Sequence, residues 1–175
     1  MDPTYSKIRY IPNTGHSLAG SDVIDTVAAV YYSIVNSIEL PNYMFHHNYT
    51  ADGVTVTVKV LNNMKPSRVL LWSANNRYSR DFRMASIGAS FSSKTLTESE
   101  PNVWTVSFPN PSVGYTALTI ELVYDNFIAA IQKSLKVTTS AYIVPDTYVC
   151  AGSRFDEHLW TTLFMIVLLI IVVLV

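Results

Sequence analysis

A histidine in a predicted turn is the residue of this chain whose surroundings best suit acid–base chemistry. His16 follows a short apolar segment, which is where sheet-based hydrolases carry the histidine of a catalytic triad. A triad also needs a nucleophile and an orienting acid. The nearby options are Ser17, Ser21, Asp22 and Asp25. Helix capping already explains Ser21 and Asp22, and the sequence contains no Gly-x-Ser-x-Gly elbow. From the residues alone, an ordinary turn histidine is favoured.

The densest group of charges lies in the middle of the chain, beside aromatic residues. It comprises Arg77, Arg80, Asp81 and Arg83, next to Trp72, Tyr78 and Phe82. Arginine clusters recognise carboxylates and phosphates. The same residues also predict a turn in which Asp81 binds an arginine while other guanidinium groups lie over aromatic rings, and this interpretation is favoured.

Two adjacent histidines carry no metal-binding signal. His46 and His47 fall where the chain becomes β-rich, and neighbours on a strand point to opposite faces, so they cannot hold one ion together. We expect neither a metal nor another cofactor.

A strand, loop and helix are predicted to position His16. Residues 7–11 alternate like a strand and end at Pro12, and a turn and loop follow as far as Gly20. Ser21 is the expected N-cap of an amphipathic helix that ends near Ser37. Its apolar positions recur at helical spacing: Val23, Val27, Val30, Tyr31 and Ile34. Together these elements form half of an α/β unit.

The remainder of the chain predicts an antiparallel β-sandwich. Residues 54–60 place valine on one face and threonine or lysine on the other, as in a half-buried strand. Further strands are predicted at 69–73, 103–108, 116–124 and 136–144. Residues 127–135 are ambiguous between a short helix and an irregular edge. With turns and no long helix between the strands, a sandwich is expected.

Composition excludes several classes of protein. The formal net charge of −1 gives no electrostatic footprint for nucleic acid. The single cysteine, Cys150, excludes an internal disulfide framework. Asn48 opens an Asn-Tyr-Thr triplet, which is a candidate glycosylation site and suits a luminal fate.

The chain ends in an apolar segment that predicts membrane attachment. Residues 163–175 are all apolar and would form about 20 Å of helix, against about 30 Å of bilayer core. A polar spacer precedes them, and four small candidate lipid-attachment residues precede the spacer: Cys150, Ala151, Gly152 and Ser153. This order fits a cleaved glycolipid-anchor signal, and a short anchor helix is the alternative.

The N-terminal residues lack the secretion signal that a glycolipid-anchored protein would need. Secretion normally requires an N-terminal apolar run behind basic residues, and the first seven residues contain none. Either the chain is the C-terminal part of a longer precursor, which we favour, or it is a tail-anchored protein.

Three stretches resemble the PhoPQ-activated pathogenicity-related protein family. They read Arg-Tyr-Ile-Pro-Asn-Thr-Gly-His-Ser-Leu-Ala-Gly-Ser-Asp at 9–22, Leu-Trp-Ser-Ala at 71–74 followed by Arg-Asp-Phe-Arg at 80–83, and Pro-Ser-Val-Gly-Tyr-Thr-Ala at 111–117. They occur in the family's order, and the resemblance extends over roughly residues 5–145. It implies an α/β-hydrolase-type domain followed by a β-rich domain. It also raises His16 to a triad-type position.

The expected fold class is therefore α+β, in four parts. Residues 1–40 would be the remnant of the hydrolase-like domain, 41–149 the β-sandwich, 150–162 a spacer, and 163–175 the hydrophobic helix or cleaved signal. The serine elbow and acid are missing, so the resemblance implies that the chain is not catalytic by itself. The expected partners are membrane lipid, on the extracellular or luminal face, and the absent hydrolase portion. The alternative is a complete, non-catalytic, membrane-anchored interaction protein.

Overall fold

Two antiparallel sheets pack face to face in the described part of the chain. The structure, a computed structural model, describes residues 7–147. The first sheet has the order β1-β2-β5, formed by Tyr43–Thr50, Gly53–Val60 and Val103–Pro109. The second has the order β4-β3-β6-β7, with β8 also paired to β6. Its strands are β3 (Arg68–Asn76), β4 (Ser92–Thr95), β6 (Tyr115–Ile128), β7 (Lys133–Thr138) and β8 (Tyr142–Val144). The predicted sandwich is confirmed.

The space between the sheets is the hydrophobic core. Valines of β2 meet alternate apolar residues of β6, and Leu118, Ile120 and Leu122 are each no more than 1% exposed. On the outer face of the first sheet, Thr57 of β2 bonds to Thr105 of β5. The predicted alternation of valine and polar residues along β2 is therefore confirmed.

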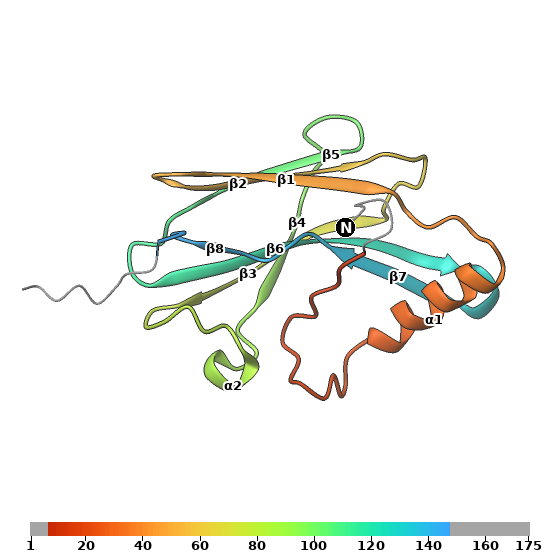
Figure 1. The fold of residues 1–175 in the computed structure, drawn as a ribbon, viewed down its shortest axis with the longest axis horizontal. Coiled ribbons are helices and arrows are strands. Elements are labelled where there is room, and N and C mark those ends of the chain that lie inside the picture. Colours follow the sequence, from red (N-terminus) through yellow and green to blue (C-terminus); the bar gives the residue numbers. More distant parts are fainter. Residues whose placement is uncertain (1–6, 148–175) are drawn as a thin grey trace, which may run out of the picture.

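The second sheet is covered on its outer face as well. Figure 1 shows the N-terminal segment, helix α1 (Val23–Val35) and the short helix α2 (Met84–Ile87) on the side of this sheet away from the first sheet. Because both faces are covered, β6 is buried continuously from Tyr115 to Tyr124. The molecule thus has a third, partial layer.

The N-terminal segment is attached to the sandwich but is not the expected strand. Among residues 7–22, Ile8 alone forms a β-bridge, with Thr138 of β7, and the Ile8 carbonyl accepts from the Thr138 backbone N–H at 2.8 Å. The Tyr10 backbone N–H donates instead to the Thr138 side-chain oxygen, at 3.0 Å. The side-chain bond ends the ladder after one bridge, so the prediction of a strand over 7–11 was too long.

Helix α1 packs against β7, and its Val30 and Tyr32 are partly buried against the hydrophobic core. The buried positions are Ala29 and Ser33, and the apolar stripe on the opposite side faces solvent. This stripe consists of Ile24, Val27, Tyr31, Ile34 and Val35, each between 57% and 69% exposed. We call it the α1 stripe. The helix itself was predicted. Of the five apolar positions that identified it, three lie in the exposed stripe.

Ion pairs fix this orientation of the helix. The Asp22 carboxylate binds both Arg9 of the N-terminal segment and Lys136 of β7. One turn further, Lys133 donates to Asp25 at 2.6 Å. Asp22 occupies the N-cap position, one residue after the predicted Ser21, but its side chain makes no capping bond, and the Ser21 hydroxyl accepts instead from the Val23 backbone N–H at 3.4 Å. The Asp22 carboxylate binds the two cations instead.

One further strand differs from the prediction, one open stretch is settled, and one predicted segment is not tested. The strand expected over 136–144 is split into β7 and β8, because Thr139 turns its hydroxyl to the Ile120 backbone N–H between them. The ambiguous stretch 127–135 contains a 3-10 turn, Ala129–Ile131, before β7. The apolar C-terminal segment, expected as a helix, lies outside the described residues.

Candidate functional site

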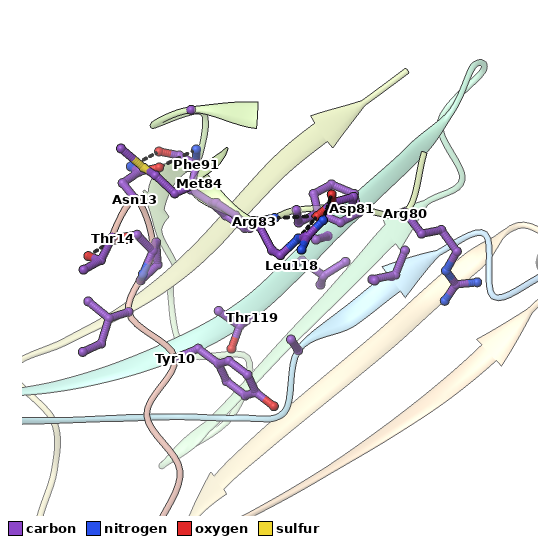
Figure 2. Close-up of a pocket in the computed structure, with 17 residues that line it drawn as sticks. Tyr10, Asn13, Thr14, Arg80, Asp81, Arg83, Met84, Phe91, Leu118 and Thr119 are labelled. Carbon is purple, nitrogen blue, oxygen red and sulfur yellow. Dashed lines mark hydrogen bonds and ion pairs between the residues drawn. The ribbon is translucent and has the colours of Figure 1, made fainter. Parts of the chain in front are cut away.

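A pocket of about 370 Å³ lies between the N-terminal segment and the α2 loop. Its floor comes from residues 117–119 of β6, with Ala141 and Ile143 beside them. One wall is the N-terminal stretch 10–14 and the other is formed by residues 80–84 with Gly88 and Phe91. Segments distant in sequence therefore build the site on the outer face of the second sheet (Figure 2).

A pair of hydrogen bonds holds the two walls together at one end. The Asn13 side chain donates to the Phe91 carbonyl at 2.8 Å and accepts from the Phe91 backbone N–H at 2.9 Å. The amide thus satisfies both backbone groups of Phe91, as a strand partner would. Asn13 has a positive φ of 58°, a conformation that asparagine tolerates better than most residues. This local geometry closes the pocket beside α2.

An arginine–carboxylate pair stands at the other side of the pocket. Arg83 donates from Nε to Asp81 Oδ1 at 2.8 Å and from Nη2 to Asp81 Oδ2 at 2.6 Å. Hydrogen bonds from Arg83 lower the pKa of Asp81 to about 2, and the same contact raises the pKa of Arg83. Figure 2 shows this pair across the pocket from Tyr10 and Thr119. Both groups remain charged at neutral pH.

The charged cluster identified in the sequence is divided by the fold. Arg80, Asp81 and Arg83 line the pocket, whereas Arg77 is exposed outside it. Arg80 lies over the Tyr115 ring at 5.7 Å and donates to the Pro145 carbonyl at 3.3 Å. The expected arrangement, an aspartate bound to arginine and a guanidinium over an aromatic ring, is what the structure has.

His16 is exposed in the loop between the N-terminal segment and α1. Among residues 7–147, no side chain forms a hydrogen bond or ion pair with it, so no triad is assembled in this part of the chain. The loop starts from the pocket wall, because Thr14 lines the pocket and His16 lies two residues later. His16 therefore stays a prediction.

The other predicted site residues are not brought to the pocket. Asn48 is exposed on β1, in the first sheet. Cys150, Ala151, Gly152 and Ser153 lie outside the described residues. Within residues 7–147 there is no cluster of three histidine, cysteine or acidic side chains suited to a metal. No helix in that same part is long and apolar enough to span a membrane.

Sequence reasoning missed the pocket wall formed by residues 10–14 and its pairing with Phe91. These residues read as a turn, and the only signal in them was the asparagine, a residue that tolerates positive φ and binds backbone groups. Which backbone it binds, seventy-eight residues away, depends on the tertiary fold.

The fold is that of a β-sandwich protein with a partial α-helical layer on one sheet. A pocket walled by loops lies on the same sheet. The profile of the PhoPQ-activated pathogenicity-related protein family matches residues 3–83. The resemblance to this family is therefore confirmed for that part of the chain, which includes the first two of the three similar stretches. The third stretch, at 111–117, lies beyond the matched residues. No curated protein and no solved structure showed significant similarity to the chain.

Proposed function

We propose that this chain is the C-terminal part of a hydrolase-like protein of the PhoPQ-activated pathogenicity-related family. In this proposal the β-sandwich is an accessory module, and α1 with its preceding loop belongs to the interface with the hydrolase domain. The observation that carries the proposal is the α1 stripe. A helix that presents its apolar side to water lacks a partner layer.

The energetics of α1 support this interpretation. Full burial of one large apolar side chain contributes about 1.5–3 kcal/mol. Covering the α1 stripe with a partner surface would therefore contribute several kcal/mol to the free energy of association. The other side of the helix packs on β7 through Ala29 and Ser33 and through ion pairs. A helix between two layers, with its apolar side toward the larger one, has this distribution. The absent layer would be the sheet of the hydrolase domain.

In the parent protein His16 would be the general base of an acyl hydrolase. Its loop precedes α1, which matches the position implied by the family resemblance. Because residues 7–147 supply it with neither an acid nor a serine partner, the 175-residue chain is expected to be inactive alone. A fluorophosphonate probe for serine hydrolases should not label the purified chain; labelling would contradict the proposal.

Membrane attachment is a separate part of the proposal. The apolar composition of residues 163–175 supports it, with the module on the extracellular or luminal side. Phosphatidylinositol-specific phospholipase should release the protein from intact cells if a glycolipid has replaced the segment. Retention after phospholipase, with release only by detergent, would favour a helical anchor, and release by buffer alone would contradict attachment.

The gene provides the most direct test of the parent. The reading frame upstream of the Met1 codon should be open and should encode a signal peptide and a Gly-x-Ser-x-Gly elbow. An in-frame stop codon with a promoter directly upstream would contradict the proposal.

Co-purification would then test the interface. The encoded hydrolase portion, expressed separately, should bind the 175-residue chain. Tyr31→Glu in the α1 stripe should abolish this binding. Tyr78→Glu is the matched control, because Tyr78 is 91% exposed but lies away from α1. Equal binding by both variants would show that the stripe is not the interface.

A second candidate function has one observation in its favour. The Ile8 bridge to β7 and the ion pairs of α1 attach the N-terminal region to the sandwich, as in a self-sufficient fold. This favours the alternative of a complete, non-catalytic interaction protein, in which the α1 stripe contacts another protein. An in-frame stop codon directly upstream of Met1 is the result that would select it.

A further inference from the structure

The pocket beneath the N-terminal segment has the dimensions of a small-molecule site. Its volume of about 370 Å³ falls at the lower end of the range of about 300–1,000 Å³ that is typical of ligand pockets. This size suits a short ligand.

Most of the pocket surface is apolar. The N-terminal wall contributes Tyr10, Ile11 and Pro12, and β6 contributes Ala117. The apolar residues of the opposite wall are Phe82, Met84 and Phe91. Phe82 and Phe91 lie with their ring centroids 6.4 Å apart, at an angle of 57°. A hydrocarbon chain placed between these walls would lose contact with water along both walls and the floor.

A positioned cation marks one side of this apolar pocket. Asp81 accepts from Nε and Nη2 of Arg83 and so uses two of the five N–H donors of the guanidinium. No other group in residues 7–147 accepts from the three that remain. Arg83 is 82% exposed along its side chain, which leaves those donors accessible to a ligand. The pocket lining also contains Arg80, which forms an ion pair with Asp146 at 3.9 Å, so Arg83 is the guanidinium that we assign to the ligand.

We propose that this pocket binds a medium-chain carboxylate such as octanoate. The hydrocarbon tail lies between the Tyr10–Pro12 wall and the Phe82–Phe91 wall, and the carboxylate accepts hydrogen bonds from Arg83 at the mouth. All the residues involved lie between positions 10 and 143, so binding does not depend on the hydrolase portion or on membrane attachment. Binding would also place the ligand near the His16 loop, because two residues span at most about 7 Å.

Calorimetric titration of the full 175-residue chain tests this proposal with three probes. Octanoate should bind saturably at one site. Octanol, which keeps the tail but has no charge, should bind about three- to tenfold more weakly, as expected for loss of a partly solvated charged hydrogen bond. Acetate should not bind measurably. Equal affinities for octanoate and octanol would overturn the role of Arg83.

Two pairs of variants locate the site. Ala141→Phe places a ring at the pocket from an exposed position, so it should abolish binding of octanoate and octanol without disturbing the core. Ala51→Phe, in the exposed turn between β1 and β2, is its control and should bind normally. Arg83→Gln should reduce octanoate affinity to the octanol level, whereas Arg77→Gln should not. Unchanged octanoate binding by Ala141→Phe would overturn the proposal.

Discussion

The two faces of strand β6 are both buried, but by different chemistry. Toward the first sheet, Leu118, Ile120 and Leu122 meet the valines of β2 in a dry, apolar core. Toward the outer layer, Thr119 bonds to the Thr139 carbonyl at 3.3 Å, and the buried Glu121 accepts from the Trp72 ring N–H at 3.0 Å. The same face also buries Ala117 and Val123, so its covering combines polar and apolar contacts, whereas the inner face is apolar.

Helix α1 reflects the polar character of that outer face. It attaches there through ion pairs, small residues and the partly buried Val30 and Tyr32, and it leaves the α1 stripe in water. The inner interface of the sandwich determines the stability of the fold. The outer interface determines where α1 and the loop with His16 are placed. Substitutions in the two interfaces should therefore differ in their effect on stability.

Truncation in the inner interface should have the largest effect. Ile120→Ala removes a fully buried side chain and should reduce the free energy of unfolding by about 2–5 kcal/mol. Ile24→Ala in the α1 stripe is the matched control and should change it by less than about 0.5 kcal/mol. Urea denaturation of both variants gives the two values, and similar losses would contradict the assigned roles.

Removal of the shared carboxylate in the outer interface should have a smaller effect. Asp22→Asn weakens the contacts to Arg9, whose side chain is 10% exposed, and to Lys136. Because Asp22 itself is partly solvated, we expect a loss of about 1–2 kcal/mol. Asp125→Asn, which breaks an exposed pair with Arg68, should cost about 0–1 kcal/mol. A loss at Asp22 no larger than the loss at Asp125 would show that the Asp22 network does not hold α1.

Acid should weaken the same outer interface. Burial alone would raise the pKa of Asp22, but the hydrogen bond from Lys136 and the charges of Arg9 and Lys136 outweigh it, so the pKa is lowered. Because the folded pKa lies below the unfolded one, this contribution is present above about pH 4 and is lost as the pH falls further. In a pH series of urea denaturation, Asp22→Asn should lose less stability than the wild type below about pH 4. Parallel curves would contradict the coupling.

Removal of the carboxylate beside the pocket should have the smallest effect on stability. Asp81 is bonded to an exposed arginine and to groups of its own loop. Asp81→Ala should therefore leave the urea midpoint nearly unchanged. A midpoint shift as large as that of Asp22→Asn would show that the Asp81–Arg83 pair is buried in solution.

The sequence predicted the inner interface well and the outer one poorly. Alternation of valine with threonine located β2, and turn residues separated β3, β5 and β6, whereas β1 was given no predicted bounds. Strand β4 was missed because its residues, Ser-Ser-Lys-Thr, are all polar and exposed. A strand can be recognised in the sequence when burial of one face makes apolar and polar residues alternate, as in β2. Strand β4 has no buried face and therefore no such alternation.

Helix α1 illustrates the limit of such reasoning. Periodicity identifies which side of the helix is apolar, but it does not identify what covers that side. Ala29 and Ser33, which face β7, gave no signal in the sequence, because small residues are compatible with either environment. The pocket could not be predicted from the sequence for a related reason, because the Asn13–Phe91 contact joins residues that only the tertiary fold brings together.

Thiol labelling would test the orientation of α1 most directly. In a Cys150→Ser background, Ile34→Cys and Ala29→Cys place one thiol on each side of the helix. A thiol at 34, where the native side chain is 68% exposed, should react as fast as in the unfolded chain. A thiol at 29, where exposure is 0%, should react only when the helix detaches. Protection at 34 with rapid reaction at 29 would show that the helix packs with its apolar side inward, and the account of an absent partner layer would be wrong.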